Sequence, residues 1–182
     1  MAKEECILCQ IIDGKIPSKK LYEDDEVIAV LDINGANPGH SFVMPKEHHT
    51  ILEQVPDQIV AKLFQVSNMV STAIFESLEI QGTNLFVTNG IAAGQVTAHF
   101  MVNIIPRKEG DGINLQWPPK QLTEEEMSTV ELQLKEGVEN MGAVSEVDVN
   151  EKAEKEAVNE VPVNETIPDE DDYMVKQLNR IP

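Results

Sequence analysis

Basic residues are scarce in this 182-residue chain, in which 14 lysines and arginines stand against 32 aspartates and glutamates, for a formal charge of −18. Because such a chain repels the phosphates of DNA and RNA, we expect no nucleic-acid partner. Two cysteines are too few for a secreted scaffold built on disulfides. The N-terminal MAKEEC lacks the pattern of a signal peptide, and no apolar run approaches the roughly 20 residues that span a bilayer. These absences predict a soluble, cytoplasmic protein without a membrane partner.

Acidic residues are concentrated in the last third of the chain. Residues 1–120 carry 15 acidic and 9 basic side chains, whereas residues 121–182 carry 17 and 5. The first 120 residues also hold seven of the eight aromatic residues, and they can bury enough surface to fold as one domain. We therefore predict a domain over 1–120, a helix over 121–141, a disordered acidic linker over 142–172 and a terminal segment over 173–182. The terminal segment is apolar and basic, which suits recognition of a protein partner, although an ordinary frayed terminus explains it equally well.

Apolar patterning predicts an α+β domain. Short apolar runs at 27–31, 41–44, 85–87 and 100–105 have the length of strands, and turn-forming residues fill 34–39 between the first two. So short a connection makes those two strands antiparallel. Helical spacing runs from Pro56 to about Glu79, and Thr123 with Glu126 forms a capping box for a second helix. The expected fold is an antiparallel sheet with one long helix, followed by the C-terminal helix and an acidic extension.

Cys6 and Cys9 form a C-x-x-C pair near the start of the chain. Such a pair is a redox couple, half of a zinc site, or two buried thiols. The redox interpretation is disfavoured, because only five residues precede Cys6 and a redox motif normally follows a strand. A tetrahedral Cys2His2 site would need two of the four histidines: His40, His48, His49 and His99. Spacing alone leaves the zinc site and the buried thiols as alternatives.

A glycine-bearing loop, residues 89–95, leads into the alternating segment HFMVNIIPR. Strand periodicity places His99, Met101 and Asn103 on one face of this segment and its large apolar residues on the other. A loop of this kind beside polar side chains suits phosphate binding, but a structural hairpin shows the same pattern and is the more common case.

Three segments in this order, CILCQIIDGKIPSKKLYEDDEVIAVLDI, PGHSFVMPKEH and GQVTAHFMVNIIPR, resemble the histidine triad (HIT) family. The resemblance covers about residues 6–119 and is closest to the Hint-type branch of small nucleotide-binding homodimers. It implies an α+β monomer and a homodimer in which two sheets join into one.

The resemblance also implies a structural zinc ion. The family's ligands are two cysteines, the histidine after Pro-Lys-x and the first histidine of the triad, which here are Cys6, Cys9, His48 and His99. His49 is adjacent to the expected ligand, so an exchange between the two stays open, as does a pair of metal-free thiols with His99 in the core. Bound zinc would tie the N-terminus to the central sheet.

The motif that defines the family is broken in this chain. In the family, the middle histidine of the triad attacks the α-phosphorus of a nucleotide and becomes nucleotidylated, and the third helps to hold the phosphate. Met101 and Asn103 occupy these positions here, and a thioether has none of the acid–base chemistry of an attacking imidazole. Val96 stands where the family has a phosphate-binding serine or threonine, and Thr88 where it has an asparagine. We therefore assign no catalytic residue.

The nucleoside end of the site matches the family better. By resemblance, Asp32 accepts hydrogen bonds from the ribose hydroxyls. The other expected nucleotide contacts are apolar residues around the base and the loop glutamine: Leu8, Ile11, Val30, Ile33 and Gln95. Alternatively, the apolar residues belong to the core and Asp32 caps a turn. A role for His40 as a substitute nucleophile is a further, less favoured alternative.

The sequence thus predicts a catalytically degenerate, zinc-stabilised HIT homodimer that works by binding. The ligand would be a purine nucleoside or nucleotide, a protein partner reached through the C-terminal tail, or both. The alternative is an active nucleotide hydrolase or phosphoramidase with an altered mechanism. A third hypothesis, a redox protein acting through Cys6 and Cys9, predicts free thiols and no metal.

Overall fold

Strands β2 (Val27–Leu31) and β3 (Ser41–Pro45) form a hairpin around the turn-rich segment 34–39. The two strands pair antiparallel over their whole length, as the short connection predicts. The structure, a computed structural model, describes residues 3–142. The linker and terminal segment predicted beyond these residues lie outside the described part of the chain.

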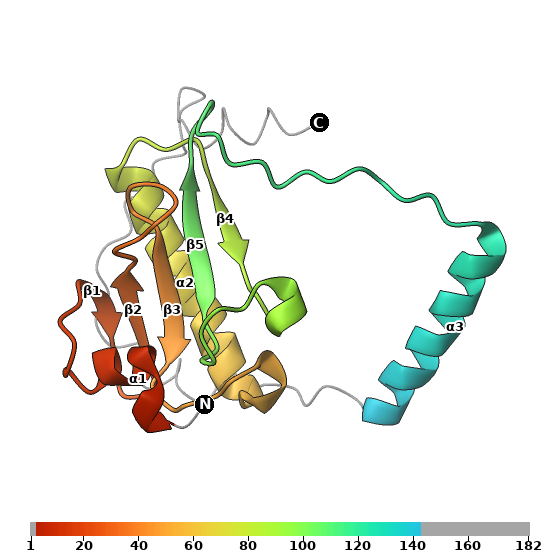
Figure 1. Cartoon of the computed structure of the whole chain (residues 1–182), viewed down its shortest axis with the longest axis horizontal. Helices are drawn as coiled ribbons and strands as arrows, with labels where there is room; N and C mark the ends of the chain where they lie inside the picture. Colours follow the sequence, from red (N-terminus) through yellow and green to blue (C-terminus); the bar gives the residue numbers. More distant parts are fainter. Residues whose placement is uncertain (1–2, 143–182) are drawn as a thin grey trace, which may run out of the picture. The chain divides into compact units, whose positions relative to one another are not determined.

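The sheet has five strands in the order β1-β2-β3-β5-β4, and every neighbouring pair is antiparallel (Figure 1). Its two edges are β1 (Lys20–Glu23) and β4 (Gly82–Phe86), and β5 (Val102–Arg107) lies between β3 and β4. This arrangement confirms the predicted α+β class with an antiparallel sheet.

The predicted bounds of the last two strands need correction. β4 begins three residues earlier than expected, at Gly82, and ends before Val87. β5 begins at Val102 rather than Phe100 and continues through Pro106. Proline is tolerated there because β3 pairs with β5 only as far as Ile104, so that beyond this residue β5 has a neighbour on one side only.

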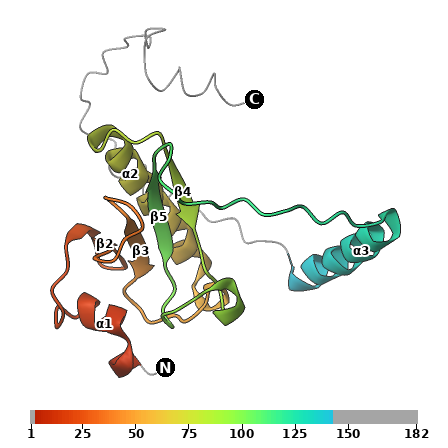
Figure 2. The ribbon, with the colours of Figure 1, turned by 45° about the horizontal axis from the view of Figure 1, so that its top comes forward.

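Helices lie on both faces of the sheet (Figure 1, Figure 2). The long helix α2 (Asp57–Ser77) buries its apolar stripe against one face, together with Phe100, Val102 and Ile104. The short helix α1 (Ile7–Ile12) packs on the other face, where Met101 joins the apolar cluster. The predicted alternation along residues 99–104 is therefore confirmed.

Helix α3 (Glu124–Met141) begins with a complete capping box, in which Thr123 and Glu126 exchange hydrogen bonds between side chain and backbone. All of its residues are exposed, including an apolar stripe that contains Met127, Val130 and Leu134. No helix within residues 3–142 is both long enough and apolar enough to cross a membrane.

Candidate metal centre and ligand-binding face

Helix α1 positions two buried thiols. Cys6 is the N-cap of the helix and Cys9 lies on its first turn, with exposed fractions of 0% and 3%. The helix ends after Ile12, at the Asp13-Gly14 pair, where Gly14 adopts a φ of +74° that favours glycine. Both cysteines are free, so the C-x-x-C pair is not closed by a disulfide.

Two histidines from distant segments meet these thiols. His48 follows β3 and His99 precedes β5, and the backbone N–H of Phe100 donates to the carbonyl of His49 at 2.7 Å. This hydrogen bond holds the two segments together. The rings of His48 and His99 lie edge to face, with centroids 5.2 Å apart.

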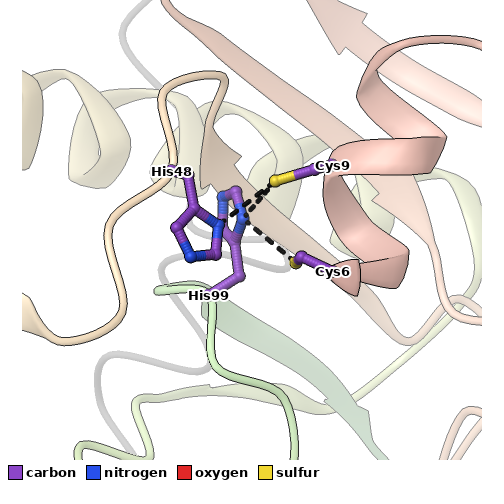
Figure 3. Close-up of side chains that lie close together, drawn as sticks. All are labelled: Cys6, Cys9, His48 and His99. Carbon is purple, nitrogen blue, oxygen red and sulfur yellow. Dashed lines mark hydrogen bonds between the residues drawn. The ribbon is translucent and has the colours of Figure 1, made fainter. Parts of the chain in front are cut away.

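The four side chains converge on one point (Figure 3). Cys9 Sγ lies 3.2 Å from Nδ1 of His48 and 3.5 Å from Nδ1 of His99, and Cys6 Sγ lies 3.6 Å from the same atom of His99. All four potential ligand atoms are within 4.8 Å of one another. The cluster can therefore hold a metal ion.

Burial sets the charge state of this cluster. Burial lowers the pKa of His99 to about 4, so that its ring is neutral at pH 7. The Nε2 of His99 lies 2.9 Å from the carbonyl oxygen of Pro45, to which it donates, and this leaves the lone pair of Nδ1 directed at the thiols. Burial and the neighbouring Cys6 raise the pKa of Cys9 to about 11. A cation among these groups would offset the cost of forming the thiolate.

His49 does not join the cluster. Its Nε2 lies 3.8 Å from the carboxylate of Glu47 instead. The resemblance therefore selected the histidine that the structure brings to the thiols, a choice that spacing alone left open. The carbonyl of Pro45, which orients His99, carries no sequence signal because any residue offers a backbone oxygen.

The second candidate site lies on the face of the sheet that α1 covers. Met101 packs against the apolar cluster that contains Leu8, Val30 and other buried residues of this face. Ile11 packs against the same cluster, whereas the side chain of Ile33 is 87% exposed. The predicted base-pocket residues other than Ile33 thus lie in or against one apolar cluster, in which Leu8 and Val30 are buried.

Asp32 and His40 lie together in the loop after β2. One Asp32 oxygen accepts from the backbone N–H of Asn34 at 2.8 Å, and the other lies 3.9 Å from Nδ1 of His40. The backbone N–H of Ala36 donates to that nitrogen at 3.0 Å. Because Nδ1 accepts, the ring carries its proton on Nε2, which lies 3.3 Å from Oδ1 of Asn103. Sequence reasoning did not predict the hydrogen bond between His40 and Asn103.

The side chain of Gln95 forms hydrogen bonds within and beside its own loop. Its side-chain oxygen accepts from the backbone N–H of Gly90, and its amide nitrogen donates to the carbonyls of Thr50 and Thr97. Asn89 likewise accepts from the N–H of Leu52 and donates to Glu53. The polar groups of this glycine-bearing loop therefore largely satisfy one another, as in the structural interpretation of the segment.

A cavity of about 300 Å³ lies elsewhere in the domain. Its walls come from the loop before β3, the end of α2, the end of β5 and the turn after it: Asn37, Pro38, Leu78, Ile80, Pro106 and residues 108–111. None of the residues predicted to bind a metal or a nucleotide lines it.

Comparison with known protein families decides the assignment. The family model of the HIT domain matches residues 13–110, more than half of the chain. The chain belongs to the HIT family. Among relatives of this HIT protein is the "Adenylylsulfatase HINT3" of Arabidopsis thaliana, 43% identical over 109 residues. That match covers 60% of this chain and 55% of the Arabidopsis protein, so the chain spans about half the length of this relative.

Solved HIT structures share the fold. A HIT family protein from Bacillus anthracis superposes with a TM-score of 0.69 at 35% identity, over 74% of this chain and 97% of its own. A histidine triad family protein from Mycobacterium smegmatis, described as Zn-bound, superposes with a TM-score of 0.59 at 29% identity. The superposition covers 75% of this chain and 99% of the mycobacterial one.

Proposed function

We propose that this HIT protein binds a purine nucleoside or nucleotide on the sheet face covered by α1, without transferring a nucleotidyl group. The observation that carries this proposal is Met101, which packs with the apolar cluster at the position where the family's attacking histidine is expected. A thioether has no proton to exchange and is a weak acceptor, so it serves packing rather than attack on phosphorus. Losing a nucleophile costs several orders of magnitude in rate.

The neighbourhood offers no ready substitute for the missing nucleophile. His40 is the nearest candidate, but its Nδ1 accepts from the N–H of Ala36 and its Nε2 donates to Asn103. An attacking imidazole needs an unengaged lone pair, and in this arrangement the only lone pair is already used. This supports a binding role over a rescued catalytic one.

We further propose that the metal is structural zinc, in the manner of the Hint-type branch. Two thiolates and two imidazoles are the soft and intermediate ligands that suit a closed tetrahedral zinc site. Zinc bonds of about 2.0–2.1 Å to nitrogen and about 2.3 Å to sulfur put such ligands roughly 3.5 Å apart. The observed S···N distances of 3.2 to 3.6 Å fit that spacing. Bound zinc would hold the N-terminus against the sheet, with no open position for chemistry.

The homodimer is proposed to form through the β4 edge. Within the described residues β4 pairs only with β5, so its outer edge can pair with a second copy. Leu85, Phe86 and, on α2, Phe64 are 48%, 40% and 44% exposed. Ser71 of α2 and Thr83 of β4 share a hydrogen bond of 2.8 Å, so these elements are neighbours. Their exposed apolar side chains favour burial against the same elements of a partner. A protein partner for residues 173–182 remains a sequence-based proposal, because they lie outside the described residues.

The alternative function is nucleotide hydrolysis or phosphoramidate cleavage by an altered mechanism. It is favoured by the name of the Arabidopsis relative, an adenylylsulfatase, which matches this chain over the HIT domain. On this alternative, His40 or Asp32 would carry the reaction, and substitution of either would abolish it.

A parallel measurement of binding and turnover separates the two functions. The full-length protein is titrated with AMP and GMP and assayed with a fluorogenic nucleoside phosphoramidate, as are its Met101→His and Met101→Leu variants. We expect binding with background turnover in the wild type and in Met101→Leu, and turnover at least about tenfold higher in Met101→His, because a nucleophile is restored. Wild-type turnover that a His40→Ala change abolishes would establish the alternative.

A further inference from the structure

We propose that the ligand of this face is an uncharged purine nucleoside rather than a nucleotide. This inference rests on the proposed function, since it concerns the same binding face. It follows from the groups that a 5′-phosphate would meet beside a bound nucleoside. Those groups are apolar, already hydrogen-bonded, or negatively charged.

Met101, Asn103 and His40 do not include a lysine or arginine that could pair with a phosphate. Met101 contributes a thioether packed on the apolar cluster. Asn103 is engaged at both ends of its amide, because Oδ1 faces His40 at 3.3 Å and Nδ2 donates to the carbonyl of Phe86 at 3.4 Å. The Nδ1 atom of His40 already accepts a hydrogen bond from the backbone N–H of Ala36. A phosphate dianion would find no lysine or arginine among these three residues, and its one remaining side-chain donor would be the second N–H of the Asn103 amide.

The side chains of the loop that leads into the strand are equally unsuited to an anion. The amide of Gln95 uses its donors on the carbonyls of Thr50 and Thr97, and its oxygen accepts from Gly90. Val96, the next residue, is 97% exposed and presents only methyl groups. Moving the Gln95 amide onto a phosphate would break the hydrogen bonds that shape the loop, which makes that contact costly.

A carboxylate supplies both attraction for a nucleoside and repulsion for a phosphate. One Asp32 oxygen has Nδ1 of His40 as its recorded neighbour at 3.9 Å, which is beyond hydrogen-bond distance. A carboxylate accepts hydrogen bonds from two ribose hydroxyls but repels a second anion. The chain as a whole, with a net charge of −18, adds a long-range field of the same sign.

The test compares each nucleoside with its own monophosphate. Isothermal titration calorimetry of the full-length, metal-loaded protein with adenosine, AMP, guanosine and GMP is run at low and physiological salt. We expect a nucleoside to bind at least about tenfold more tightly than its monophosphate, and this ratio to shrink as salt rises, because screening weakens the repulsion. Tighter binding of AMP or GMP than of the matching nucleoside would overturn the inference and leave the proposed function intact. No binding of any of the four compounds would remove the proposed binding face, and the inference with it.

A charge variant with a matched control tests whether the Asp32 carboxylate causes the preference for a nucleoside. Asp32→Asn removes the carboxylate at the binding face, and Asp25→Asn removes an exposed one at the other end of β2, roughly 20 Å away along the strand. We expect Asp32→Asn to weaken nucleoside binding and to reduce the nucleoside-to-monophosphate ratio by about threefold or more. Asp25→Asn should leave the ratio unchanged. Equal effects of the two changes would contradict a local repulsion.

Discussion

The Nε2 atom of His40 lies 3.3 Å from Oδ1 of Asn103, joining the loop after β2 to the start of β5. The side chain of His40 is only 11% exposed, so this contact fixes its ring inside the domain. Because the Nδ1 lone pair already accepts from the backbone N–H of Ala36, we expect this imidazole to position the proposed binding face rather than to react.

Breaking this pair should lower stability. Asn103→Ala leaves the N–H of His40 without its acceptor in a mostly buried place, and we expect the free energy of unfolding to fall by about 1–2 kcal/mol. Urea denaturation followed by circular dichroism measures the change. Asn68→Ala on the exposed face of α2 is the matched control, with an expected change below about 0.5 kcal/mol. If the free energy of unfolding falls by the same amount in the two variants, the His40–Asn103 contact does not stabilise the fold.

Removing one metal ligand should remove the metal. We expect His48→Ala and Cys6→Ser to purify without stoichiometric zinc and to melt about 10 °C or more below the wild type, because binding of the ion is coupled to folding. Elemental analysis and thermal denaturation provide the two readouts. His49→Ala alters the adjacent histidine, which faces Glu47, and should keep its zinc. Zinc loss in His49→Ala with retention in His48→Ala would reverse the ligand assignment.

A charge at the β4 edge should dissociate the proposed dimer. Leu85→Lys places an ammonium group on the exposed face of this strand, where burial against a second copy would require its desolvation. We expect this variant to be monomeric by light scattering coupled to size-exclusion chromatography, with the wild type a dimer. Leu21→Lys makes the same change on β1, at the opposite edge of the sheet, and should stay dimeric. Dimers in both variants would place the interface elsewhere.

Acid should destabilise the domain partly through Asp111. The Arg107 guanidinium, which donates to both oxygens of this carboxylate at 2.6 and 2.9 Å, holds its pKa well below its usual range, aided by the N–H of Ile113. Folding thus favours the charged form. The resulting stability is fully present above the unfolded pKa of about 3.9 and is lost as the pH falls below that value.

Asp111→Asn tests this acid dependence. We expect the variant to be less stable than the wild type at pH 7 and to lose less stability between pH 5 and pH 3, measured by urea unfolding at each pH. Asp25→Asn, an exposed carboxylate that forms no recorded ion pair within residues 3–142, should keep the wild-type profile. If Asp111→Asn and the wild type lose the same free energy of unfolding between pH 5 and pH 3, the proposed role of the Arg107–Asp111 pair is contradicted.

Elements defined by periodicity were predictable from the sequence. The long helix follows from apolar residues at helical spacing, and the β2–β3 hairpin from two apolar runs around a turn, so both match the structure to within a few residues. The extension of β5 through Pro106 was not predictable, because it depends on where the neighbouring strand β3 stops pairing.

Side-chain contacts were harder to predict from the sequence than the fold. Spacing identified a pair of cysteines and four candidate histidines, but adjacent residues such as His48 and His49 point in different directions, and only the path of the chain decides which one meets the thiols. The contact between His40 and Asn103 joins residues 63 positions apart and follows no local pattern. Resemblance to a family narrowed the first choice; for the second it placed His40 near the triad positions without predicting this contact.

The thiol–imidazole cluster joins Cys6 to His99, residues 93 positions apart. During synthesis the cysteines leave the ribosome early, whereas the last ligand emerges only after four of the five strands have been made. The complete ligand set therefore first exists when residue 99 of 182 has been made, with only β5 of the sheet still to follow. Metal binding at this centre could therefore link helix α1 to the sheet only after β1 to β4 have been synthesised.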